Sequence, residues 1–258
     1  MRTWIASAVA LLLCVFTLAP PARADQGESQ ERIRDAAQVF NEIMNTPDKG
    51  IPQDLLGEAQ CVVIIPSMMQ GAFVFGAKYG RGVATCRTGS GWSAPSMVLM
   101  GGGSFGFQIG GAAIDVVALI MNKHGEEFLY RDKVNLGADA TVAAGPVGRR
   151  ASAETNATMK SEILTWSRSR GLFAGVALNG ATLRTDKSAN RRLYGDATTR
   201  QILAGNVATP PAARPLIAAL TREGLAPGTN RPAEPRGLGK PTDHDKDPDR
   251  DIDRDRDH

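Results

Sequence analysis

Histidine is scarce in this chain, and His124 is the one histidine that precedes the C-terminal tail, where His244 and His258 lie. Any Ser–His–Asp or Cys–His chemistry in the body of the chain would therefore depend on His124. It lies in Lys-His-Gly-Glu, a sequence typical of a solvated turn, and the chain has no HExxH or CxxC motif. We therefore predict a protein that is not an enzyme and has no catalytic residue, cofactor or metal site.

A glycine string, Gly101-x-Gly103-x-x-Gly106, matches the dinucleotide-binding fingerprint. The fingerprint requires a helix whose N-terminus faces the pyrophosphate. Here Gly110-Gly111 would interrupt that helix, and the run that follows, 112–121, is apolar and β-branched. The glycines therefore indicate bent strands or a close backbone approach. A transmembrane helix over 98–121 is the alternative, and Asp115 argues against it.

The N-terminus has the pattern of an export signal. Arg2 precedes an apolar run, Trp4–Leu18, which has the length of a signal h-region and is short for a membrane span. Ala22-Arg23-Ala24 then supplies the small residues of a signal peptidase site. We expect residues 1–24 to be removed and the protein to be exported, as a periplasmic or secreted protein or one peripheral on a membrane. Lipidation of Cys14 and a retained anchor are the alternatives.

Charge is divided unevenly along the chain. The net charge is +3, and loss of Arg2 and Arg23 with the leader leaves +1. Residues 241–258 hold eight Asp against four Lys and Arg, a net charge of −4, so the body, residues 25–240, carries +5. A mildly basic body without a dense basic stripe favours a phospholipid or membrane surface as the partner and argues against nucleic acid.

Cys61 and Cys86 are an even pair once the leader is removed. In an oxidising compartment such a pair is typical of a disulfide. The bridge would close a loop of about 25 residues and contribute roughly 3–4 kcal/mol. Two buried thiols on neighbouring strands are the alternative.

Apolar residues recur at helical spacing over 29–45, which predicts an amphipathic helix that ends before Pro47. From Cys61 onward the chain changes to short β-like runs separated by glycine. The predicted strands are 61–65, 72–79, 82–87, 92–100, 112–121, 133–143, 161–169 and 172–185. Residues 188–206 return to a polar helical pattern, and 207–258 are predicted to be a disordered tail, Pro/Gly-rich and then Asp/Arg-rich.

These elements show no helix–strand alternation of the parallel α/β type. We therefore predict an α+β fold with a single domain over residues 25–206. Its sheet would be antiparallel, rich in glycine and strongly bent, with an N-terminal amphipathic helix and a short C-terminal helix.

Several sequence motifs, which follow one another in a fixed order from about Ile33 to Gly195, resemble those of the SYLF domain family. They are Ile51-Pro52, Gly91-Trp92-Ser93-Ala94-Pro95-Ser96, Gly106-Phe107-Gln108-Ile109-Gly110-Gly111, Ala143-Ala144-Gly145-Pro146-Val147-Gly148-Arg149, Gly171-Leu172-Phe173-Ala174-Gly175-Val176 and Asn190-Arg191-Arg192-Leu193-Tyr194-Gly195. The resemblance implies lipid binding, with phosphoinositides preferred by eukaryotic relatives through an N-terminal amphipathic helix and basic residues. It also implies actin binding for some members, and no cofactor or catalysis.

Two features depart from that pattern. The export signal argues against actin as a partner and against transferring the phosphoinositide preference. The polar face of the predicted helix carries Glu31, Asp35 and Glu42, whereas a membrane-surface helix usually presents Lys and Arg there. We therefore expect this helix to pack on the sheet.

The resulting hypothesis is an exported, non-catalytic module that binds phospholipid or another anionic lipid. Its candidate apolar contacts and headgroup partners are Phe40, Ile43, Met44, Arg149, Arg150, Arg168 and Arg170. The alternative is a structural or interaction protein of the cell envelope that self-assembles through its glycine-rich sheet. The sequence leaves open which lipid is bound and the oligomeric state.

Overall fold

The structure, a computed structural model, describes residues 22–46, 50–72, 75–105, 110–146, 161–169, 172–174 and 178–224. The chain divides into two compact units, Met1–Pro227 and Gly228–His258, and all described residues belong to the first. Its helices are α2 (Ala22–Met44), α3 (Gln53–Glu58), α4 (Lys123–Leu129), α6 (Lys187–Tyr194), α7 (Thr199–Leu203), the 3-10 helix η3 (Pro211–Ala213) and α8 (Arg214–Glu223). Its strands are β1 (Cys61–Ala72), β2 (Phe75–Thr88), β3 (Gly91–Trp92), β4 (Ser96–Phe105), β5 (Gly110–Ile120), β6 (Lys133–Asn135), β7 (Val142–Ala144), β8 (Ile163–Ser169), β9 (Leu172–Ala174) and β10 (Ala181–Thr185).

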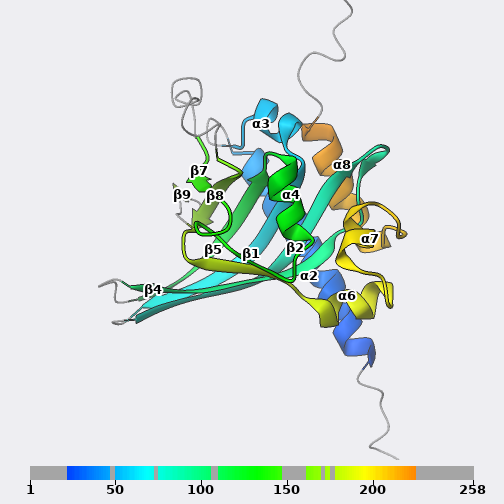
Figure 1. Ribbon diagram of the computed structural model, residues 1–258, viewed down its shortest axis with the longest axis horizontal. Coiled ribbons are helices and arrows are strands. Elements are labelled where there is room, and N and C mark those ends of the chain that lie inside the picture. Colours follow the sequence, from blue (N-terminus) through cyan, green and yellow to red (C-terminus); the bar gives the residue numbers. More distant parts are fainter. Residues whose placement is uncertain are drawn as a thin grey trace, which may run out of the picture. The chain divides into compact units, whose positions relative to one another are not determined.

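The strands form one sheet in the order β6-β10-β4-β2-β1-β5-β8-β7, with β3 paired to β2 and β9 to β8. Every pair of strands is antiparallel except β7–β8, which is parallel. The long strands β1, β2, β4 and β5 lie side by side at its centre (Figure 1). The prediction of an α+β fold with a strongly bent, glycine-rich sheet, an N-terminal helix and a short C-terminal helix is confirmed.

Two glycines that suggested strand breaks lie inside the long strand β2. A Cβ at Gly80 would overlap Cγ2 of Ile65 and lie 2.9 Å from Cγ of Met68. A Cβ at Gly82 would overlap the carbonyl oxygen of Ile64. These positions lack a side chain because β1 packs tightly over them. The runs predicted as three short strands are therefore the two long strands β1 and β2.

Helix α2 packs on one face of the sheet. Ile33, Ala36, Phe40 and Ile43 recur on its inner side and are 0% exposed. Burial of each large apolar side chain contributes roughly 1.5–3 kcal/mol, so the apolar stripe belongs to the core. Helix α8 lies beside α2 on this face (Figure 1). The expectation that the amphipathic helix packs on the sheet is met, although α2 begins at Ala22, seven residues before the predicted start at Ser29.

The opposite face of the sheet carries a second core. Alternate residues of β1 and β5, such as Val63, Ile65 and Val116, pack there against Phe128 and Leu129 of α4. Asn122 caps α4 by accepting a hydrogen bond from the Gly125 N–H at 2.7 Å. The sequence around Asn122 was predicted to be a turn, and the structure extends it into this short helix.

The fold continues past the predicted boundary at residue 206. In α8, Leu216, Ala219 and Leu220 are at most 2% exposed and join the core beneath α2. Their i, i+3, i+4 spacing and Pro215 in the first turn are helix signals that the Pro-rich composition obscured. Residues 1–21, which hold most of the predicted leader, and the tail after Gly224 lie outside the described residues.

The segment considered as a transmembrane helix, 98–121, contributes strands β4 and β5. Over the ranges that the structure describes, we find no helix with the length and apolarity needed to cross a membrane.

Candidate ligand-binding surface

Part of the sheet face that carries α2 extends beyond the helix and stays uncovered by it. Strand register aligns its residues in rows, and residues opposite one another share a face. One row runs Lys133–Arg184–Leu99–Arg81, and the next runs Asn135–Thr182–Gly101–Tyr79–Met69–Ala113. We call these two rows the open face.

Tyr79 and Met69 are the most exposed large apolar side chains of the described residues, at 49% and 58%. They lie opposite each other on β2 and β1. Met69 reaches this face because β1 holds a β-bulge between Ile65 and Met68, where one extra residue shifts the alternation of side chains. Ser67, in the bulge, has a positive φ of 46°, an uncommon backbone conformation for a residue with a side chain.

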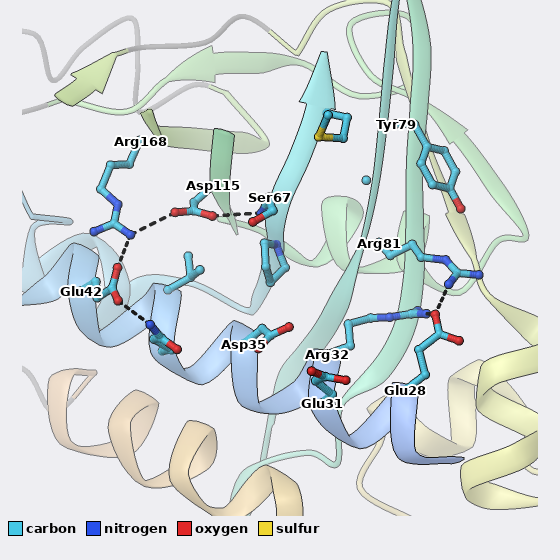
Figure 2. Close-up of a pocket in the computed structure, with 15 residues that line it drawn as sticks. Glu28, Glu31, Arg32, Asp35, Glu42, Ser67, Tyr79, Arg81, Asp115 and Arg168 are labelled. Carbon is cyan, nitrogen blue, oxygen red and sulfur yellow. Dashed lines mark hydrogen bonds and ion pairs between the residues drawn. The ribbon is translucent and has the colours of Figure 1, made fainter. Parts of the chain in front are cut away.

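A groove of about 470 Å³ runs between α2 and the sheet, beside Tyr79 and Met69 (Figure 2). Its charged lining residues are Glu28, Glu31, Arg32, Asp35, Glu42, Arg81, Asp115 and Arg168. Five carboxylates against three guanidiniums give it a net negative charge, and we call it the acidic groove.

Arg168 closes one end of the acidic groove. Its Nη2 lies 3.0 Å from Oδ2 of Asp115 and also contacts the Glu42 carboxylate on α2. The other oxygen of Asp115 accepts a hydrogen bond from the Ser67 N–H at 2.9 Å, so the same carboxylate holds the bulge (Figure 2). Hydrogen bonds from Gln38 and then Arg168 lower the pKa of Glu42 below its ordinary value.

The other two guanidiniums of the acidic groove are also paired. Arg81 contacts Glu28, and Arg32 reaches Asp186 at 3.0 Å and Glu28 at 3.5 Å. All three arginines are therefore neutralised by carboxylates, whereas Glu31 and Asp35 are exposed on α2 and pair with no cation among the described residues. The groove suits a cationic group better than an anion.

A second hollow, of about 290 Å³, lies on the other side of Tyr79. Its lining residues are Tyr79, Leu99, Met100, Gly101, Gly102, Lys133, Thr182 and Arg184. The two charged residues of this lining are cations, so we call it the cationic hollow. Sequence reasoning missed it because Lys133 and Arg184 meet only through the pairing of β6 with β10.

The structure distributes the predicted lipid contacts differently. Phe40 and Ile43 lie fully buried in the core beneath α2, and Met44 packs partly buried against that core. Arg168 lies in the acidic groove, bound to two carboxylates. Arg149, Arg150 and Arg170 lie outside the described residues. Phe40 and Ile43 could meet a lipid only if α2 left the sheet, and the described arginine of the set is already paired.

Cys61 and Cys86, which oppose each other on β1 and β2, form a disulfide bond. Glu126 lies close to both sulfurs, but sulfurs joined to each other are not thiolate ligands for a metal. The disulfide is buried in the second core of the sheet.

Two features bear on catalysis. His124 contacts Glu162 and packs edge-on to Phe128, with 4.6 Å between ring centroids, which anchors α4. Gly102-Gly103-Ser104-Phe105-Gly106 matches G-x-S-x-G as a string. That motif requires a sharp strand-to-helix turn, whereas Gly102–Phe105 belongs to strand β4. Neither feature has the context that an enzyme site needs.

Comparison with known proteins gives consistent matches. Residues 101–223 match the model of the Ysc84 family, described as Las17-binding protein actin regulator. The SH3 domain-containing protein PJ696.02 of Schizosaccharomyces pombe is 38% identical over 175 residues, which cover 66% of this chain and 40% of that protein. Protein YSC84 of Saccharomyces cerevisiae is 37% identical, over 66% of this chain and 37% of that protein. SH3 domain-containing YSC84-like protein 1 of Xenopus laevis is 33% identical, over 71% of this chain and 57% of that protein.

The chain therefore spans between 37% and 57% of the length of these relatives. The matches overturn one prediction. The prediction that actin is not a partner, which rests on the export signal, is wrong, because the matching family is described as an actin regulator and as Las17-binding.

Proposed function

Since the chain belongs to the Ysc84, or SYLF, family, we propose that it is a non-catalytic module that binds a membrane surface through the open face of its sheet. The observation that carries this proposal is the exposure of Tyr79 and Met69 side by side between two hollows. An apolar pair rimmed by charged residues is typical of an interaction surface. Tyrosine is favoured at membrane interfaces because its ring is apolar and its hydroxyl is polar.

The position of α2 supports the sheet rather than the helix as the lipid-contacting element. An interfacial helix must turn its apolar side to the lipid. In α2 that side is buried, and the outer side carries Glu31 and Asp35, which anionic lipid repels. The open face combines the exposed apolar side chains of Tyr79 and Met69 with the cations Lys133 and Arg184.

Vesicle flotation tests the proposal. The chain is mixed with vesicles of phosphatidylcholine alone and of phosphatidylcholine with phosphatidylglycerol, at low salt. We expect binding to the anionic vesicles and its loss in a Tyr79→Ser, Met69→Ser double variant. The matched control, Tyr79→Phe with Met69→Leu, keeps the apolar surface and should bind like the original chain. Absence of binding to both vesicle types by the original chain would remove the proposal.

Association with an actin-regulatory protein or with actin itself is a second candidate function, favoured by the description of the matching family. The acidic groove is the surface that a basic segment of a protein partner would fit, through Glu31 and Asp35. Co-sedimentation with filamentous actin tests direct binding. We expect a Glu31→Gln, Asp35→Gln variant to pellet less than the original chain, whereas equal pelleting would exclude the groove as the contact.

Export is part of the proposal and rests on the leader-like sequence of residues 1–24. The disulfide between Cys61 and Cys86 supports an oxidising compartment. The mass of the protein recovered from its native cells tests this point. A mature chain that begins at Asp25 supports export, and a chain that retains Trp4–Leu18 argues against cleavage.

A further inference from the structure

Lys133 on β6 and Arg184 on β10 lie directly opposite each other and are both exposed. Like charges in this relationship repel and destabilise a strand pair. Within the described ranges neither cation forms an ion pair with a carboxylate. An anion placed between them would relieve the repulsion.

The cationic hollow beside this pair is open at its base. A Cβ at Gly101 would have the carbonyl oxygen of Lys78, at 3.7 Å, as its nearest neighbour, so packing within the chain does not require glycine there. Gly102 differs, because a Cβ there would lie 2.9 Å from the Ala181 Cα. The missing side chain at Gly101 leaves room over the sheet between Arg184 and Tyr79.

Of the hollows that border the open face, the cationic hollow is the one whose charges favour an anion. Its lining contains no acidic residue. The acidic groove on the other side of Tyr79 carries Glu28, Glu31 and Asp35 and repels anions. A third hollow, beside α6 and α7, is lined by Lys187, Arg191 and Arg200. It also contains two carboxylates, Asp196 and Asp132, and Asp132 pairs with Lys187.

We infer that the cationic hollow binds a phosphate group. Guanidinium is planar and can donate two parallel hydrogen bonds to phosphate oxygens, and the Lys133 ammonium adds a point charge. The Thr182 hydroxyl, which also lines the hollow, donates its hydrogen to Oδ1 of Asn135 at 3.1 Å, so the two cations make the contact with the phosphate. The inference rests on the proposed function in one respect: a membrane lipid supplies the phosphate, with Tyr79 and Met69 against the lipid beside the headgroup. A soluble phosphate ester is the other source of the same chemistry.

The test uses the full chain and two double variants of equal charge change. Lys133→Gln, Arg184→Gln removes the pair, and Arg34→Gln, Lys123→Gln removes two exposed cations that do not line the hollow. Each protein is titrated with inorganic phosphate while the amide resonances of Gly101 and Thr182 are followed by NMR. Each is then floated with phosphatidylglycerol vesicles across a salt series. Far-UV circular dichroism checks that both variants fold.

We expect phosphate to shift both amide resonances in the original chain and in the control variant, and not in Lys133→Gln, Arg184→Gln. Vesicle affinity should fall roughly 30-fold in that variant, since each cation near an anionic surface contributes a factor of about five. Phosphate binding at the hollow without vesicle binding supports the site with a soluble ester as ligand and ends the membrane proposal. Vesicle binding that the Lys133→Gln, Arg184→Gln variant retains in full, or unchanged resonances with phosphate, overturns the inference.

Discussion

Arg32 on α2 and Asp186, which precedes α6, form an ion pair with 3.0 Å between Nη1 and Oδ2 and only 6% and 5% of the two side chains exposed. Asp186 also caps α6 by accepting a hydrogen bond from the Ala189 N–H at 3.1 Å. One carboxylate therefore joins the N-terminal helix to a helix more than 150 residues later in the chain. Because a buried charge without its partner is costly, this contact holds α2 in place only while both groups are ionised.

The first prediction concerns the stability of the fold at low pH. Burial by itself raises the pKa of Asp186, but hydrogen bonds from the Ala189 N–H and from Arg32 outweigh it and lower the pKa below its ordinary value. A carboxylate with a lowered pKa stabilises the fold above the ordinary value, near 4, and this stabilisation is lost as the pH falls through the lowered pKa.

We therefore expect the urea midpoint of unfolding to fall as the pH drops from about 5 to about 3. The Asp186→Asn variant, which cannot titrate, should be less stable at neutral pH and lose less over the same interval. Identical pH profiles for the two proteins would show that this carboxylate does not carry the effect.

The second prediction concerns the disulfide. Cys61 and Cys86 close a loop with a sequence separation of 25 residues. In the chain-entropy model this stabilises the folded state by about 3.5 kcal/mol. Urea unfolding of the original chain and of the Cys61→Ala, Cys86→Ala variant should differ by about that free energy. Addition of a reductant should lower the stability of the original chain and leave the variant unchanged.

The third prediction separates two kinds of glycine in the sheet. At Gly82 a Cβ would overlap the Ile64 carbonyl oxygen, whereas at Gly103 the nearest atom would be the Gly76 carbonyl oxygen at 3.8 Å. We expect Gly82→Ala to destabilise the fold by about 1–3 kcal/mol and Gly103→Ala to change stability by less than about 0.5 kcal/mol. Thermal denaturation measures both, and equal losses would contradict the close approach of β1 to β2.

The fourth prediction concerns Phe40, which is 0% exposed beneath α2. Phe40→Ala should cost about 3–5 kcal/mol of folding free energy because it leaves a cavity in the core. Vesicle binding per folded molecule should stay unchanged, since this side chain does not reach the surface. Flotation below the melting temperature, corrected for the folded fraction, checks this. A loss of binding without a loss of stability would instead indicate that α2 leaves the sheet to meet the lipid.

The fold was largely predictable from the sequence, because the local signals and the tertiary contacts agree over most of the sheet and over α2. The strand boundaries in β2 failed at Gly80 and Gly82. In the sequence alone, a glycine suggests the end of a strand. Only the position of Ile65 on the neighbouring strand shows that glycine is needed here because the two strands approach closely. Helix α8 was missed although Leu216, Ala219 and Leu220 have helical spacing, because the Pro-rich sequence around them suggested a tail.

The candidate surface was less predictable, for a physical reason. Residues that adjoin in sequence point to opposite faces of a strand and do not gather on one surface. Lys133 and Arg184 are about fifty positions apart and meet only through strand register, which the sequence does not encode locally. The acidic outer side of α2 could be predicted from Glu31, Asp35 and Glu42. The resulting prediction, that this helix packs on the sheet, is confirmed.

The bulge at Pro66–Ser67 lets β1 carry one residue more than the strands beside it. The additional residue belongs to β1 alone. The side chains of β1 beyond the bulge therefore alternate out of step with those before it, while the side chains of β2 and β5 alternate regularly. Deletion of one codon there would remove the bulge and leave Met69 opposite Tyr79 and Ala113, on the same face as before. The outward side chains of β1 beyond the bulge therefore tolerate the loss of this one residue, whereas a one-residue deletion elsewhere in the strand would turn side chains to the opposite face.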